Sequence, residues 1–165
     1  QPVFDPNSQL YKGAVVFTMP SGDMGTWKLE INVNGMQAEM DLQIHLAPAQ
    51  TKLVGTYQGT DGNYYVISLI EPSAPKIGMN DLMILVNRRA TMHSFPTVAN
   101  LVVEMEPEMP SMGHGSPNNE DPVSMGDGIY KGKVNFTMSG DWRLHFKLKQ
   151  GETVLVEDAF LDLMF

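Results

Sequence analysis

The sequence predicts an all-β protein in which one complete β-sandwich follows a repeated half-domain. Three observations support this fold class. Apolar and polar residues alternate over short segments, residues that favour turns separate these segments, and one stretch of the chain occurs twice. No amphipathic helix of convincing length interrupts the pattern. Short alternating strands with frequent turns are typical of a sandwich of two antiparallel sheets.

The repeated stretch predicts the same β-hairpin twice. The first copy runs from Tyr11 to Leu29 and the second from Tyr130 to Leu144, and both contain Tyr-Lys-Gly, Phe-Thr-Met, Ser-Gly-Asp and Trp-x-Leu in that order. Self-similarity of this kind indicates one supersecondary unit used twice. In each first strand the alternation puts the final methionine on the apolar face. We therefore expect Met19 and Met138 in the core.

The second strand of each copy alternates just as strictly. Inward positions carry Trp27, Leu29, Ile31 and Val33 in the first copy and Trp142, Leu144, Phe146 and Leu148 in the second. A turn containing Gly follows each strand, at Asn34-Gly35 and Gln150-Gly151. Further strands are expected over residues 40–46, 64–70, 82–87, 100–106 and 155–165.

The positions of these strands divide the chain in two. Residues 57–165 have three strands upstream of the repeat and predict a complete sandwich. Residues 1–50 have none, so they resemble the C-terminal half of a second sandwich. An incomplete sandwich leaves a sheet edge exposed. We therefore expect the half-domain to pack on the complete domain or to pair with a protein partner, including a second copy in a homodimer.

Composition restricts the function. The net charge of −8 argues against nucleic-acid binding and against an anionic membrane surface, because both need basic patches. With no cysteine, the chain has no disulfides, no Cys-type zinc site and no thiol catalysis. No apolar run approaches the length of a membrane span. The chain begins at Gln1 rather than at an initiator Met, so we expect a processed piece with room for an export signal before it.

The segment from Met109 to Gly115 is the strongest candidate site. It reads Met-Pro-Ser-Met-Gly-His-Gly, in which Pro and Gly predict a loop. The thioethers of Met109 and Met112 and the imidazole of His114 together suit Cu(I) better than Zn(II), Mg(II) or Ca(II). His93 is the candidate fourth ligand. The alternative is a loop whose methionines fold back over the core and whose histidine makes a local hydrogen bond.

Other polar residues are weaker candidates. His45 and His145 alternate outward, which indicates solvent-facing positions. Glu104, Glu106 and Glu108 form an acidic stripe, either a solvated strand face or a field that concentrates cations near the loop. The motifs of nucleophile elbows, zinc proteases, phosphate-binding loops and dinucleotide folds are missing from the sequence. We therefore expect a protein that is not an enzyme.

Several motifs link the complete domain to a known group of proteins. They are Pro75-x-x-Gly78-x-Asn80-x-Leu82, the Met109–Gly115 loop, Gly128-x-Tyr130, and Met138-Ser-Gly-Asp-Trp142-x-Leu144. With them, residues 64–165 resemble the YtkA-like/FixH-like group of small exported β-sandwich domains, in particular Bacteroidetes-type exported proteins. The resemblance implies an Ig-like fold and a periplasmic or cell-envelope-anchored setting. It also implies a role in handling copper or heavy metals, or in assembling copper oxidases.

These observations lead to two hypotheses. In the first, the protein is an exported metal-binding module that holds copper as Cu(I) through Met109, Met112, His114 and His93, for buffering or delivery. In the second, it is a structural or protein-interaction module of the cell envelope without a metal, since a fold alone does not determine function. The two differ in whether the sulfur atoms and the imidazole converge on the surface.

Overall fold

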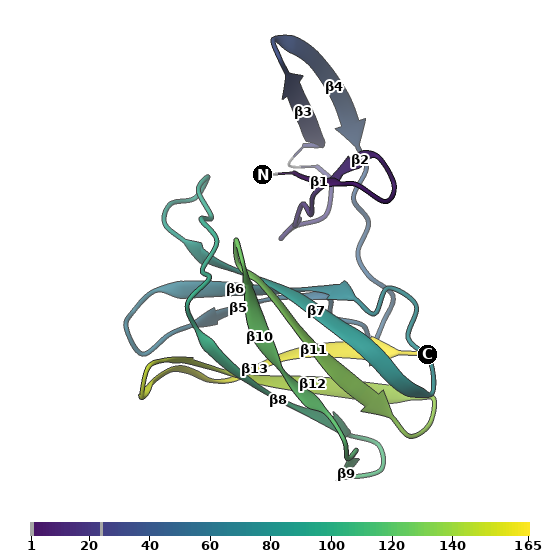
Figure 1. The fold of residues 1–165 in the computed structure, drawn as a ribbon. Coiled ribbons are helices and arrows are strands. Elements are labelled where there is room, and N and C mark those ends of the chain that lie inside the picture. The colour runs from purple at the N-terminus through teal and green to yellow at the C-terminus, as the bar shows by residue number, and fades with distance from the viewer. Residues whose placement is uncertain (1, 24) are drawn as a thin grey trace. The chain divides into compact units, whose positions relative to one another are not determined.

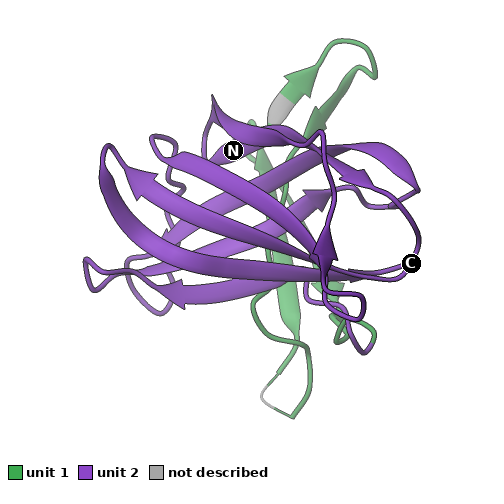
Figure 2. Ribbon diagram, turned by 90° about the horizontal axis from the view of Figure 1, so that it is seen from below, with its two compact units in different colours: residues 1–48 green, residues 49–165 purple. Residues whose placement is uncertain are grey.

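A computed structural model describes residues 2–23 and 25–165, and strands are the only regular secondary structure in these ranges. The chain forms two compact units, residues 1–48 and residues 49–165 (Figure 2). The predicted complete domain begins at residue 57, whereas the second unit also includes β5 (Val54–Gln58) from its start. The described residues contain no helix of the length and apolarity that a membrane crossing requires.

The second unit contains two antiparallel sheets (Figure 1). The five-stranded sheet has the order β10-β11-β7-β6-β5. Its strands besides β5 are β6 (Tyr64–Glu71), β7 (Gly78–Arg89), β10 (Glu120–Gly126) and β11 (Ile129–Phe136). The four-stranded sheet has the order β13-β12-β8-β9. Its strands are β8 (Val102–Met109), β9 (His114–Gly115), β12 (Asp141–Gln150) and β13 (Thr153–Met164).

The strand order confirms the Ig-like sandwich. In constant-type immunoglobulin domains, strands A-B-E-D form one sheet and strands C-F-G form the other. Here β6-β7-β11-β10 has the A-B-E-D order and β8-β12-β13 has the C-F-G order, with β5 added beside β6 and β9 beside β8. The chain therefore crosses between the sheets after β7, and β9 together with the loop before it forms an addition at the edge of the second sheet.

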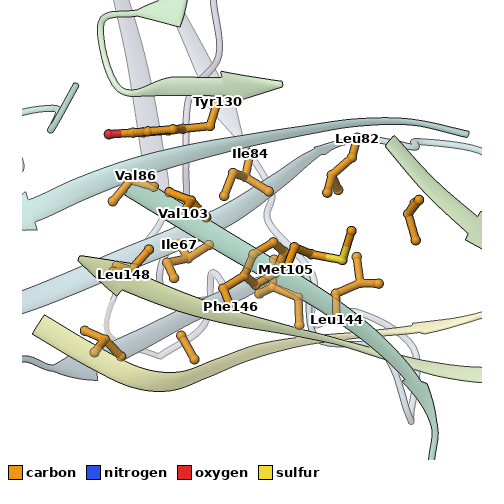
Figure 3. Packing of buried hydrophobic residues seen from close by; sticks show 14 of the residues in the cluster. Ile67, Leu82, Ile84, Val86, Val103, Met105, Tyr130, Leu144, Phe146 and Leu148 are labelled. Atoms are coloured by element: carbon orange, nitrogen blue, oxygen red, sulfur yellow. The ribbon is translucent and has the colours of Figure 1, made fainter. Parts of the chain in front are cut away.

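The core lies between the two sheets (Figure 3). Trp142, Leu144, Phe146 and Leu148 of β12 are at most 1% exposed, as their alternation predicts. They face Ile67, Leu82, Ile84 and Val134 among other buried residues of the five-stranded sheet. Met105 is 7% exposed, which confirms the inward row of β8.

Tyr130 forms hydrogen bonds to the connection between β7 and β8, which crosses from one sheet to the other. Its ring is fully buried, its hydroxyl donates to the carbonyl oxygen of Val98 at 2.8 Å, and the same hydroxyl accepts the amide of Leu101 at 3.1 Å. Both partners lie between β7 and β8. A buried side chain thereby satisfies two backbone groups that a sheet ladder does not reach.

The first unit contains two hairpins. β1 (Val3–Asp5) pairs with β2 (Leu10–Lys12), and β3 (Trp27–Val33) pairs with β4 (Met36–Leu42). β3 ends where the alternation predicts. The turn after it has φ values of 51° at Asn34 and 84° at Gly35, as a two-residue hairpin of type I′ requires.

The repeat keeps its local geometry in both units. The indole of Trp27 donates to the carbonyl of Met19 at 3.0 Å, and the indole of Trp142 donates to the carbonyl of Met138 at 2.9 Å. A phenylalanine ring lies 5.3 Å from the indole in both cases. The two copies therefore share the contacts of the tryptophan with the methionine carbonyl and the phenylalanine ring, although the first has three extra residues between its Ser-Gly-Asp and its Trp.

The first strand of the repeat forms in one unit only. β11 pairs with β7 along eight residues, whereas residues 13–17 form no strand. A strand needs a partner for its backbone groups, and no described strand pairs with residues 13–17 as β7 pairs with β11. The predicted core positions of Met19 and Met138 are wrong, because these side chains are 62% and 36% exposed.

Candidate functional site

The loop after β8 closes a tight hairpin. β9 pairs back on the end of β8, with Met109 opposite His114 and Glu108 opposite Gly115. Inside the loop, the amides of Met112 and Gly113 both donate to the carbonyl of Met109, at 3.0 and 2.8 Å. Gly113 has a φ of 65°, which glycine adopts without steric cost. These bonds give the segment one defined conformation.

Asp141, the first residue of β12, holds the middle of this loop. Its carboxylate accepts both the amide of Ser111 at 3.0 Å and the hydroxyl of Ser111 at 2.5 Å. The hydrogen bond from that hydroxyl outweighs the opposing effect of burial and lowers the pKa of Asp141. The carboxylate is therefore ionised at neutral pH, which strengthens its bonds to the loop.

The structure separates Met109 from the other two predicted ligands. Met109 is the last residue of β8 rather than a loop residue, and it is only 5% exposed within the core. Its methyl group lies against Gly140, where an added Cβ would be 2.2 Å from Met109 Cε. Met109 continues the inward row of Val103 and Met105, so the same alternation that identifies Met105 as core also predicts this position.

Met112 and His114 remain at the surface. Met112 is 60% exposed. His114 is half-buried, with its ring edge-on to Trp142 at a centroid distance of 6.0 Å. The three predicted ligands therefore do not converge at the surface, since one sulfur atom points into the core. The alternative of a loop whose methionines fold back over the core and whose histidine makes a local hydrogen bond therefore describes Met109 and His114, whereas Met112 stays exposed.

One ring nitrogen of His114 makes a local contact with the backbone. Nδ1 lies 2.9 Å from the carbonyl oxygen of Gly115. When Nδ1 carries the proton and donates to this oxygen, Nε2 keeps its lone pair. Histidines that bind metals usually make such a bond through the other ring nitrogen, because it fixes the tautomer and the direction of the ring.

His93 does not join this loop. It is an exposed residue between β7 and β8, where its amide donates to the hydroxyl of Thr91 at 3.2 Å. The Met109–Gly115 loop follows β8, so the two candidate segments lie at opposite ends of that strand (Figure 1). Eight residues of extended strand span about 26 Å, much too far for His93 and His114 to share an ion.

An acidic groove of about 810 Å³ adjoins the loop. His114 and its two glycine neighbours line one side of it. The other lining residues come mainly from β8, β12 and β13, and they include six carboxylates: Glu104, Glu106, Glu108, Asp121, Glu157 and Asp158. The acidic stripe of β8 therefore runs beside the loop, where it creates a negative potential that attracts cations.

Basic residues of β12 alternate with these acids across the sheet. Lys147 pairs with Glu157 at 2.6 Å, and Lys149 pairs with Glu104. Arg143, at the end near the loop, pairs with Asp162 of β13 at 2.7 Å. Exposed pairs of this kind contribute little stability each, but they fix which carboxylates stay available to an incoming cation.

His145 is the polar residue whose surroundings sequence reasoning missed. Its Nδ1 lies 2.7 Å from Asp158 and its Nε2 lies 2.9 Å from Glu108. Partial burial disfavours its charged form, but the bonds to Asp158 and Glu108 outweigh burial and raise the pKa of His145. Alternation places the residue on the outer face, whereas its two partners depend on pairing that the local sequence does not reveal.

The described residues, 2–23 and 25–165, contain no cluster of three or more His, Asp or Glu side chains arranged to hold a metal ion. Both nitrogen atoms of His145 contact carboxylates in the acidic groove.

Comparison with known proteins gives one match. A family model described as YtkA-like matches residues 60–147, slightly more than half of the 165 residues. The matched range contains β8, the Met109–Gly115 loop and β11. No curated protein and no solved structure matches the chain significantly.

Proposed function

The chain belongs to the YtkA-like family, and we propose that its sandwich is a non-catalytic module that binds Cu(I) at Met112 and His114. The geometry of the Met109–Gly115 loop is the main support for this proposal. The loop holds an exposed thioether and an imidazole with an available Nε2 two residues apart, in a conformation fixed by Asp141. Thioether and imidazole are ligands that suit Cu(I).

A Cu(I) ion held by only two side chains of the protein is better suited to exchange with a partner than to long-term storage. A partner protein can supply a further ligand to an ion that is held by only two side chains, so the ion passes on without first leaving the module. The acidic groove beside His114 raises the local concentration of cations. Both features suit copper buffering or delivery.

The proposed setting is the periplasm or the outer side of an anchoring membrane. A site built from methionine and histidine needs no free thiol, and free thiols tend to become oxidised outside the cytosol. The chain contains no cysteine at all. Expression with an export signal, followed by fractionation of the cells, tests this setting independently of copper binding.

Competition titration tests the site. Cu(I) is added to the protein and a chromogenic Cu(I) chelator, and the wild type is compared with Met112→Ala/His114→Ala. Met92→Ala/His93→Ala is the matched control, because it removes another exposed methionine and histidine from the opposite end of β8. We expect at least a tenfold loss of affinity in the first variant and none in the control. Equal affinities in all three proteins would exclude the site.

A structural or protein-interaction role without copper is the second candidate. Two observations favour it, namely the burial of Met109 and the local hydrogen bond of His114. Under this function the wild type does not compete with the chelator at all. The same titration therefore separates the two candidates.

A further inference from the structure

One face of the β3–β4 hairpin is entirely apolar. Residues directly opposite each other in an antiparallel pair lie on the same face, and four such pairs alternate with polar ones. We call this surface the hairpin face. It consists of the pairs Trp27/Leu42, Leu29/Met40, Ile31/Ala38 and Val33/Met36. The other face carries the charged pairs Lys28/Asp41 and Glu30/Glu39.

The hairpin face is exposed where its counterpart is buried. Ile31, Val33, Met36 and Met40 are 44%, 50%, 72% and 55% exposed. In the other unit, β12 and β13 form the matching pairs Trp142/Leu163, Leu144/Leu161 and Phe146/Ala159, all at most 4% exposed. The repeat thus presents the same face twice, covered within residues 49–165 and open within residues 1–48.

The covered copy shows which surface fits. In residues 49–165 the β12–β13 pairs pack against the apolar side of another antiparallel sheet. A two-stranded hairpin alone is marginally stable and gains stability when a further sheet covers its apolar side. A partner for the hairpin face should therefore offer a flat apolar sheet surface without charges. Another hairpin face has this chemistry.

We propose that the hairpin face binds the hairpin face of a second copy of this chain. A two-fold axis brings one patch against its own copy, so a single uncharged surface satisfies both partners. The outward charges of Lys28, Glu30, Glu39 and Asp41 stay in water in such a pair. The contact uses the face of the hairpin, whereas the sequence pattern predicts pairing through a sheet edge.

The available area limits the size of this interface. From the exposed fractions, the eight residues offer roughly 600 Å² per copy, or about 1,200 Å² in total, which is the lower limit of specific interfaces. This area is much larger than the exposed area of a single apolar surface residue, but it is small for an obligate dimer. We therefore expect a reversible dimer with a dissociation constant in the micromolar range.

Sedimentation velocity of the full chain from about 1 to 500 µM, a range chosen to span micromolar affinities, tests the proposal. The wild type should shift from monomer to dimer. Met36→Lys/Met40→Lys should stay monomeric, because burying two ammonium groups is unfavourable. Val123→Lys/Met125→Lys is the matched control, since these β10 residues are 64% and 59% exposed. It should dimerise like the wild type.

Quenching of tryptophan fluorescence by acrylamide supplies a second readout in the unmodified protein. Trp142 is 1% exposed in the core of its own unit, whereas Trp27 lies partly exposed in the hairpin face. Dimerisation should protect Trp27 as concentration rises. A monomer at all concentrations would overturn the proposal, as would a dimer that only the β10 control disrupts. Protection of Trp27 that does not depend on concentration would overturn it too, because the same chain would then cover the face.

Discussion

Replacing Met109 with leucine distinguishes core packing from metal ligation at the end of β8. Met109 is 5% exposed and its methyl group contacts Gly140. Leucine keeps most of the volume and removes the sulfur, so the free energy of unfolding should fall by less than about 1.5 kcal/mol. Met109→Ala instead leaves a cavity and should cost about 2–4 kcal/mol. Because the sulfur faces the core, Cu(I) affinity should be unchanged in Met109→Leu.

Met112→Leu should give the reverse result. This side chain is 60% exposed, so its replacement should change stability by less than about 0.5 kcal/mol. Loss of a ligand should weaken Cu(I) binding at least tenfold, equivalent to about 1.4 kcal/mol. Urea unfolding and chelator competition measure the two quantities for both variants. A tenfold loss of Cu(I) affinity in Met109→Leu would refute the reasoning, since it would make the buried sulfur a ligand.

Two further predictions concern the sandwich. Tyr130→Phe should lower the free energy of unfolding by roughly 1–3 kcal/mol in urea, because the buried amide of Leu101 and the half-buried carbonyl of Val98 lose their partner. Tyr64→Phe, at a half-buried ring, should change it little. His145→Gln should remove a pH-dependent contribution. Because the folded-state pKa of His145 is raised, its ion pairs stabilise the fold fully below about pH 6.5, the ordinary histidine pKa, and less as pH rises through the raised value. Relative to wild type, the variant should be less stable at about pH 5.5, and the difference should shrink as pH rises through the raised pKa of His145; a constant difference would refute this.

Local alternation predicts much of the sandwich. It identifies β12 and the inward row of β8 because each has one buried face, and burial leaves a period of two in the sequence. β3 has the same period although its apolar face is largely exposed, and β6 is found as a nearly continuous apolar run buried on both faces. Alternation does not predict β5 and β10. β10 carries Pro122 and only one buried residue, and β5 is a short strand with one buried glycine. Sheet edges of this kind bury too little to leave a pattern.

Pairing between strands that are far apart in the sequence accounts for the remaining differences between the predicted and the observed structure. The segment from Tyr11 to Met19 has nearly the sequence of β11, yet most of it forms no strand because no neighbouring strand pairs with it. Identical local patterns thus gave different structures in different surroundings. The distance between His93 and His114 also depends on long-range structure. β8 runs between the two segments and separates them, and this separation cannot be read from their spacing along the sequence.

In the candidate loop, the sequence predicts the ligand types but not the exposure of each side chain. Residue chemistry alone points to sulfur and imidazole ligands in one short segment. Whether each side chain faces solvent depends on where β8 ends, and the strand continues to Met109, beyond the predicted end at residue 106. That difference of three residues moves one of the three expected ligands into the core.

Methyl NMR of the protein labelled with carbon-13 at its methionine methyl groups tests the central claim most directly. Leucine substitutions assign the signals of Met109 and Met112, and Cu(I) is then added under reducing conditions. We predict that the methyl signal of Met112 shifts with one equivalent of Cu(I), while the signal of Met109, buried against Gly140, stays in place. A shift of the Met109 signal, or no shift of any methionine, would contradict a site formed by Met112 and His114.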